Sequence, residues 1–294
     1  MTPSKKGALL AIGAYALWGL FPLYWKQLHS VPAQEIVAHR VIWACVFLLL
    51  VTGFKGEFRK TFSLLKKPGI VLVYGAGAAL LTINWLTYVW AVNAGYIVDA
   101  SLGYFINPLV SVFLGLVFFQ ERLRIFQWAA IILAGSGVGY LTYAYGSLPW
   151  IGLVLAFSFG IYGLIKKIAP LEALEGQTLE MALLCCPALF VLVFLEFHHK
   201  ASFGHSGLFI GILLFLGGVV TATPLLMFSS AARRIPLSMI GILQYLAPTL
   251  QFLIGVWVYH ELFPYYRLIG FSLIWSALAI YSLEGYIHRR KSGR

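Results

Sequence analysis

The sequence has few charged residues, and acidic residues are scarcest. Of 294 residues, 21 are Lys or Arg and 10 are Asp or Glu, so charged residues make up 11% of the chain. Soluble domains average about 25% charged residues. A chain that is 61% hydrophobic lacks the polar groups needed to cover a surface in water. This composition excludes a soluble enzyme and intrinsic disorder, and it indicates an integral membrane protein.

Cysteine is also rare, and it does not occur in pairs typical of metal sites. Cys45, Cys185 and Cys186 all lie inside apolar runs, and no CxxC or Cys/His spacing is present. These features exclude a disulfide framework and a zinc site. His39 with Glu35 four residues earlier is too small a set for a metal, so we expect neither a metal nor a cofactor.

Long apolar runs are abundant. A bilayer core about 30 Å thick takes roughly 20 apolar residues to cross as a helix, and the chain is therefore predicted to be an all-α integral membrane protein with ten transmembrane helices. The first run is not a cleaved signal peptide, because Trp18 and neighbouring aromatic residues stand where small residues would be needed. The predicted runs cover residues 7–25, 36–53, 70–92, 97–119, 125–145, 149–166, 178–196, 208–231, 237–259 and 266–286.

The basic residues predict the orientation. Seventeen of the 21 Lys and Arg residues fall on the side that holds both termini, and the other four are Lys26, Arg40, Lys200 and Arg267. Basic residues concentrate on the cytoplasmic side of membrane proteins, so we expect both termini in the cytoplasm. Contact with anionic lipid heads then explains the net charge of +11, and no nucleic-acid partner is expected.

The chain resembles itself when it is shifted by 140 residues. Pro108 then falls on Pro248, and Glu121 falls on Glu261, within similar apolar patterns. Chance similarity among hydrophobic helices is the competing explanation. Because each repeat would hold five spans, an odd number, the second would cross the membrane upside down. Residues 1–146 and 147–294 are thus predicted to be two inverted five-helix repeats, an arrangement typical of secondary transporters.

Four motifs resemble the RarD-like branch of the EamA-type permeases, in the drug/metabolite transporter superfamily. They are Glu35–Trp43, Ala100–Pro108, Gln120–Leu123 and Leu243–Gln251. The resemblance covers essentially the whole chain. It implies a ten-helix, two-repeat permease of the bacterial inner membrane, with a central cavity lined by spans 1, 3, 4, 6, 8 and 9. A monomer and a homodimer are both compatible with it.

Two prolines point to a substrate site near the midplane. Pro108 and Pro248 lie near the middles of their spans, where each frees the backbone carbonyl four residues earlier. A freed carbonyl is tolerated in a membrane where it faces protein or a wet cavity. We expect a substrate cavity there, with a purely structural kink as the alternative. Its predicted lining is Tyr104, Asn107, Gln244 and Tyr245.

Other polar and aromatic residues extend the predicted substrate-binding set. Asn84 and Tyr88 are four residues apart, so they share one face of the third span. Trp18 lies near mid-depth and is predicted to form an aromatic wall. Tyr162 occupies the position in the sixth span that matches Pro22 in the first.

Arg40 and Glu180 are charged residues inside predicted spans, and they coincide under the 140-residue shift. A charge at the membrane centre costs at least about 2.5–3.5 kcal/mol. Each side chain either extends to its nearby interface or lies in a gating network beside the cavity. We assign Arg40, Glu180, Pro108 and Pro248 to gating or coupling. Glu180 is the expected proton carrier if transport is proton-coupled, and a structural anchor otherwise.

These features favour a secondary transporter that works by alternating access on a small neutral or zwitterionic solute. A proton is the partner if transport is coupled. The alternative is a non-transporting membrane protein, such as an embedded enzyme or a receptor or scaffold. Against an enzyme, the sequence has no HExxH motif, no GxSxG motif and no pair of intramembrane carboxylates. Against a receptor, it has no sizeable exposed domain. An ATP-driven pump is excluded for this chain because no P-loop occurs.

Overall fold

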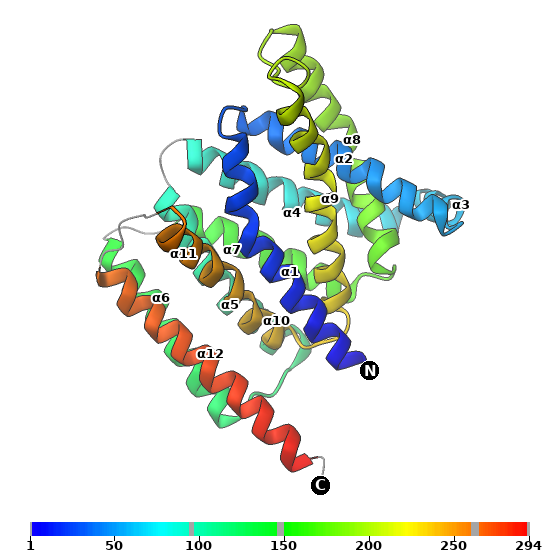
Figure 1. The fold of residues 1–294 in the computed structure, drawn as a ribbon. Coiled ribbons are helices and arrows are strands. Elements are labelled where there is room, and N and C mark those ends of the chain that lie inside the picture. Colours follow the sequence, from blue (N-terminus) through cyan, green and yellow to red (C-terminus); the bar gives the residue numbers. More distant parts are fainter. Residues whose placement is uncertain (1, 94–96, 146–149, 260–264, 293–294) are drawn as a thin grey trace.

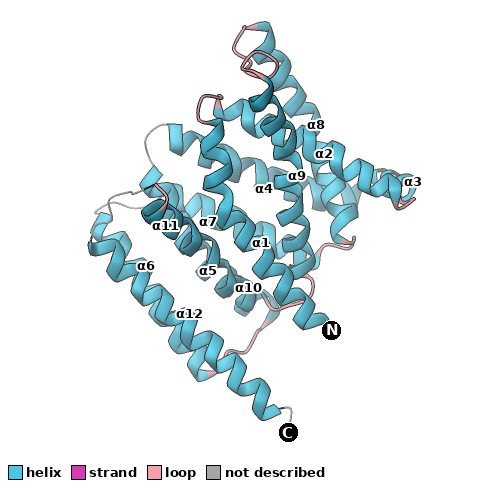
Figure 2. Cartoon of the chain, in the orientation of Figure 1, coloured by secondary structure: helices cyan, strands magenta, loops and turns pink. Residues whose placement is uncertain are grey.

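The computed structural model describes residues 2–93, 97–145, 150–259 and 265–292, and these residues form helices joined by short loops (Figures 1 and 2). Two 3₁₀ helices, η1 (Lys26–Leu28) and η2 (Leu64–Lys66), occur among them. The α-helices are α1 (Pro3–Trp25), α2 (Ala33–Phe54), α3 (Phe58–Ser63), α4 (Pro68–Asn93), α5 (Ile97–Phe119), α6 (Ile125–Tyr145), α7 (Trp150–Ile168), α8 (Ala173–Phe197), α9 (Leu208–Ala232), α10 (Leu237–Gln244), α11 (Leu246–Trp257) and α12 (Tyr265–Ser292).

Each predicted apolar run coincides with a helix, except that the ninth is divided into α10 and α11. Seven helices in the described ranges are long and apolar enough to cross a membrane. The all-helical, multi-pass class is therefore confirmed. Two further apolar stretches, Gly103–Phe119 and Leu268–Tyr281, are shorter than a full span in the described residues, so the number ten stays a prediction.

Local sequence signals mark where several helices begin. Pro3 lies in the first turn of α1, and the Thr2 side chain accepts the N–H of Lys5 at 3.4 Å. Proline is favoured there because the first turn of a helix has no use for its missing N–H. Pro68 begins α4, and Pro236 precedes α10. Gly207, with φ of 91°, makes the turn before α9.

Helices from distant parts of the chain pack side by side. Helix α2 lies against α8 and α9, and α1 lies against α9, α10 and α11. Helix α7 lies against α4 and α5. The pair α6 and α12 forms one edge of the bundle (Figure 1). The largest buried cluster is built mainly on α1, α2, α7, α9 and α10. This arrangement directs side chains of several helices toward one interior.

The outer surface of the bundle is strongly apolar. Phe54 is 89% exposed, Phe197 80% and Leu208 81%. Large exposed apolar side chains on helices of this length suit contact with lipid chains. Polar side chains such as Gln177 and Asn107 lie inside instead. This reversed distribution is that of a protein folded in a bilayer.

Candidate solute-binding site

Arg40 lies between two indole rings in the first half of α2. Its guanidinium carbon is 4.8 Å from the ring centre of Trp25, at the end of α1, and 4.7 Å from that of Trp85, on α4. Its Nε donates to Thr221 Oγ1 on α9 at 3.0 Å. Cation–π contacts stabilise a cation that has left water. Residues of three other helices thus surround Arg40.

Two tyrosines adjoin this position. The phenol groups of Tyr104 and Tyr88 lie within electrostatic range of the Arg40 guanidinium. Their rings are 5.8 Å apart and nearly edge to face. Tyr88 is 38% exposed, so part of it reaches open space. Helices α4 and α5 therefore add two hydroxyl groups to the surroundings of Arg40.

An aromatic cluster fills the centre of the bundle. Trp18 on α1 packs 5.5 Å from Phe159 on α7 and 5.8 Å from Phe228 on α9, measured between ring centres. Tyr15 and Tyr162 pack against the same rings. Tyr15 and Tyr162 are fully buried. The cluster joins α1, α7 and α9 into one wall.

A buried ion pair lies beyond this wall. Glu180 Oε2 on α8 is 2.7 Å from Lys166 Nζ on α7, and both side chains are almost fully buried. This distance makes the contact a salt bridge. Tyr162 Oη lies 3.1 Å from both Glu180 Oε2 and Gln177 Oε1. The pair keeps both charges compensated, as burial requires.

Not every polar atom of this cluster has a partner. Gln177 Nε2 and Glu180 Oε1 are buried and have no hydrogen-bond partner among the described residues. Ser229 on α9 donates to Gln177 Oε1 at 3.3 Å. A buried donor and a buried acceptor without partners cost free energy. The arrangement can therefore accept a further polar group or a proton.

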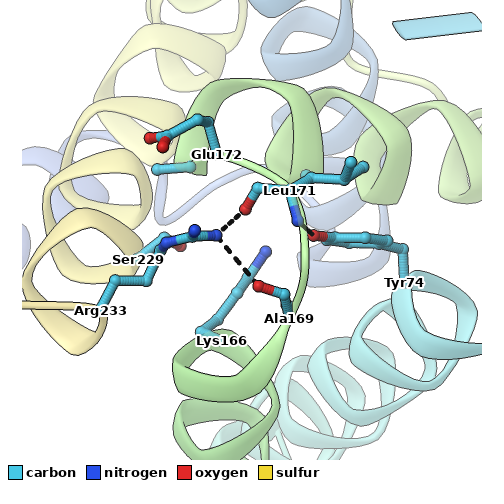
Figure 3. Close-up of a pocket in the computed structure, with 9 residues that line it drawn as sticks. Tyr74, Lys166, Ala169, Leu171, Glu172, Ser229 and Arg233 are labelled. Atoms are coloured by element: carbon cyan, nitrogen blue, oxygen red, sulfur yellow. Dashed lines mark hydrogen bonds between the residues drawn. The ribbon is translucent and has the colours of Figure 1, made fainter. Parts of the chain in front are cut away.

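A small pocket opens next to the ion pair (Figure 3). It holds about 170 Å³ of empty space, including the open solvent at its mouth, and Lys166 lines it. Tyr74 Oη on α4 accepts the N–H of Leu171 at 2.9 Å. Arg233, directly after α9, donates to the carbonyls of Ala169, at 3.0 Å, and Leu171. Figure 3 shows the turn between α7 and α8 clamped between α4 and α9.

Comparison with known proteins places these features in a family. The model of the EamA-like transporter family matches residues 5–143. The chain is 44% identical to the uncharacterized transporter YojE of Bacillus subtilis, over 98% of this chain and 97% of that one. It is 40% identical to protein RarD of Escherichia coli K12, over 98% of both chains. The protein belongs to the RarD-like EamA-type permeases.

The permease is therefore a multi-pass transporter of the inner membrane, in a family of transporters rather than enzymes. A solved crystal structure 19% identical to the permease superposes with a TM-score of 0.71, over 96% of this chain and 99% of the other. At this identity the likeness shows the fold alone. No group of three or more metal-ligating side chains occurs in the described residues.

Asn84 and Tyr245, two of the predicted solute-binding residues, donate hydrogen bonds to neighbouring helices. The Asn84 amide on α4 donates to the carbonyl of Leu155 and to Ser158 Oγ on α7, at 2.9 and 3.0 Å. Tyr245 Oη donates to the carbonyl of Phe105 at 3.2 Å. Asn107 and Gln244 are buried, and the side-chain amide oxygen of each has no hydrogen-bond partner in the described part of the chain. The cavity predicted beside these residues stays a prediction.

The two prolines behave differently, contrary to the expected symmetry. Helix α5 passes through Pro108 without a break, whereas the equivalent span has a one-residue turn at Tyr245, which keeps helical backbone angles, three residues before Pro248. Gly241 lets α10 pack directly on the carbonyl of Pro108. The backbone around Pro108 therefore has different neighbours from the backbone around Pro248. The two prolines accordingly have different effects on their helices. Pro22 also frees a carbonyl, that of Trp18, and Gln251 donates to it at 3.1 Å.

The sequence analysis did not identify a partner for Glu180. It counted Lys166 only among the basic residues on the side that holds both termini, whereas Lys166 and Glu180 form a buried pair. It also missed Gln177, Ser229 and Tyr74. One available signal was the four-residue spacing of Tyr162 and Lys166, which places both on one face of α7.

Proposed function

We propose that this permease moves a small organic solute across the bacterial inner membrane by alternating access, between two inverted five-helix repeats. Ten spans divide the chain into residues 1–146 and 147–294, with both termini cytoplasmic. The observation that carries this proposal is a pair of charged sites at positions 140 apart. Arg40 lies among aromatic rings, and Glu180 lies beside Lys166.

Helix packing supports the repeat. Under the 140-residue shift α2 corresponds to α8, α5 to α10 and α11, and α6 to α12. The pairs α2–α8, α5–α10 and α6–α12 each pack together. The contact of α1 with α9 has its equivalent in that of α7 with α4. Helices that pack on their own equivalents are expected near a two-fold axis.

Individual contacts support the same axis. The hydrogen bond from Tyr245 to Phe105 joins residues 140 apart. Glu35 accepts the N–H of Ser202 from the loop between α8 and α9, at 2.7 Å. Its equivalent, Glu175, pairs at 2.7 Å with Lys60 on α3, from the matching loop of the first repeat. Each repeat thus binds the other through related positions.

We assign the solute site to side chains between the repeats, with charged gates on either side. Arg40 belongs to the outer gate and Glu180 to the inner gate. The clamp formed by Tyr74, Arg233 and the turn between α7 and α8 closes the inner pocket. Pro108 and Pro248 are the proposed flexible points. The solute-binding residues are Trp18, Asn84, Tyr88, Tyr104, Asn107, Tyr162, Gln244 and Tyr245.

A cross-link tests alternating access. Thr52 on α2 and Thr178 on α8 are buried, and their hydroxyl oxygens are 3.1 Å apart. In a cysteine-free background, Thr52→Cys with Thr178→Cys joins the repeats when oxidised. We expect proteoliposomes to lose counterflow of labelled solutes on oxidation and to regain it on reduction, while each single-cysteine variant is insensitive. Undiminished flux through the cross-linked protein would contradict this mechanism.

Screening for flux tests transport itself. Labelled amino acids, aromatic acids and amides, and nucleosides are offered to proteoliposomes and to protein-free liposomes. Flux of at least one solute above the protein-free control is expected. Proton coupling is tested on the same system, with Glu180 and Lys166 as the proposed carriers. A Lys166→Met, Glu180→Gln variant is expected to exchange solute but to lose acceleration by a pH gradient.

A further inference from the structure

We propose that Arg40 binds the carboxylate group of a small organic solute in the outer half of the permease. This inference rests on the proposed transport function and adds the chemical class of its substrate. It starts from a charged side chain that has no counter-ion among the described residues. No carboxylate of the described residues lies within ion-pair distance of Arg40.

Six carboxylates of the described residues have partners elsewhere. Glu35 accepts N–H groups of Ser202 and Phe203, and Glu121 accepts those of Leu237 and Ser238. The remaining ion pairs in the described ranges join Glu175 to Lys60, Glu180 to Lys166, Glu196 to His205 and Glu284 to Arg124. A cation inside a membrane protein normally faces a counter-charge or a wet cavity. The unmatched charge of Arg40 therefore suits a ligand that supplies the anion.

The geometry leaves the end of the guanidinium group available. Arg40 Nε donates its hydrogen bond to Thr221, and the indole rings of Trp25 and Trp85 contact the guanidinium group. The terminal nitrogens donate to no described residue, so a ligand can take up their hydrogen bonds. Two parallel N–H groups on a fixed planar fork match the two oxygens of a carboxylate.

The surroundings favour an organic anion over an inorganic one. Gly217 lies beside Arg40 and Trp25, where a Cβ atom would still be 3.9 Å from Arg40 Cγ and 3.7 Å from the Trp25 ring. Tyr88 and Tyr104 add further aromatic surface. Such walls contact a flat apolar group and offer little to a hydrated ion such as phosphate. A small carboxylate with a planar apolar body fits both features.

Matched acids and amides test this on the purified full-length protein. Binding is followed by tryptophan fluorescence and by thermal shift, with benzoate against benzamide, acetate against acetamide, cyclohexanecarboxylate as a non-planar acid, and inorganic phosphate. We expect benzoate to bind at least about tenfold more tightly than benzamide, because a charge-assisted pair is lost in the amide. Benzoate should also bind more tightly than cyclohexanecarboxylate and phosphate. Equal affinities for benzoate and benzamide, or no binding by any carboxylate, would overturn the proposal.

Variants localise the effect. Arg40→Gln should remove the preference for benzoate, and Arg40→Lys should retain part of it, since lysine keeps the charge but not the fork. Arg59→Gln is the matched control, because Arg59 is exposed on α3 and should change nothing. Thr221→Val keeps every charge and should weaken benzoate binding by releasing Nε. A folded Arg40→Gln protein that still prefers benzoate to benzamide would contradict the assignment. If Arg40→Gln fails to fold, unchanged benzoate affinity in Thr221→Val would contradict it instead.

The outcome is separable from that of the proposed function. Carboxylate binding that depends on Arg40, without flux in proteoliposomes, would support this site and contradict transport. Flux of uncharged solutes without carboxylate binding would support transport and contradict the carboxylate site.

Discussion

At the residue scale, the pair formed by Lys166 and Glu180 is the main feature that sequence reasoning did not reach. Both residues were visible, but a lysine at the end of a span is expected to extend toward lipid heads. Only the folded arrangement shows that its ammonium group turns inward to the carboxylate of Glu180 on α8. Arg40 stands out in the sequence as a charge inside a span, whereas its indole partners come from two other helices, α1 and α4.

The ion pair predicts a non-additive effect on stability. Glu180→Gln leaves the Lys166 charge buried without its partner, which typically costs about 3–5 kcal/mol. Lys166→Met with Glu180→Gln removes both charges, so we expect the double variant to be clearly more stable than the single one. Thermal unfolding of the purified proteins measures both. Additive losses from the two substitutions would mean that the charges do not interact.

At the element scale, most helix boundaries were predictable, because long apolar runs can hardly form anything else in a bilayer. The division at Tyr245 was not. Pro108 and Pro248 present the same local signal, and only the tertiary surroundings of α5 and α10 distinguish them. The packing distance between helices could not be predicted from the sequence either, because it depends on which glycines contact the backbone of a neighbouring helix.

Gly218 and Gly217 give a matched test of that packing. A Cβ atom on Gly218 would overlap the backbone between Trp43 and Ala44 on α2, whereas one on Gly217 would lie 3.7 Å from Trp25. Both substitutions to alanine raise helix propensity equally. We therefore expect Gly218→Ala to lower stability by about 1–3 kcal/mol through overpacking. Gly217→Ala should be neutral or slightly stabilising in the same thermal measurement, and equal effects would contradict the close contact of α2 and α9.

The prolines give a second matched pair. Pro248→Ala restores an N–H group that can bond to the carbonyl of Gln244 and join α10 to α11. We expect it to raise the unfolding temperature and to slow solute exchange, because the flexible point is lost. Pro108→Ala lies in a helix that is already continuous, so its effect on exchange should be smaller. Equal slowing by both substitutions would argue that the division at Tyr245 has no role in transport.

At the scale of the whole molecule, the class of protein follows from composition, while the cavity cannot be read from it. A shortage of charge is a property of the entire surface, so it predicts the membrane environment directly. The solute site depends on how ten runs are placed around one another. That arrangement brings Trp85 to Arg40 from another helix, and Glu180 to Lys166 across the turn between α7 and α8. Periodicity within one helix contains no information about such pairs.

Orientation in the membrane is tested by labelling at two exposed lysines in a cysteine-free background. Lys66 lies in η2 before α4, and Lys200 lies in the loop between α8 and α9. The excess of basic residues predicts Lys66 in the cytoplasm and Lys200 outside. A membrane-impermeant maleimide should therefore label Lys200→Cys in intact cells and Lys66→Cys only after permeabilisation, with the cysteine-free protein as the control. Because an odd number of spans per repeat requires these two matching loops to lie on opposite sides, labelling of both from one side would contradict the orientation and the inverted repeat together.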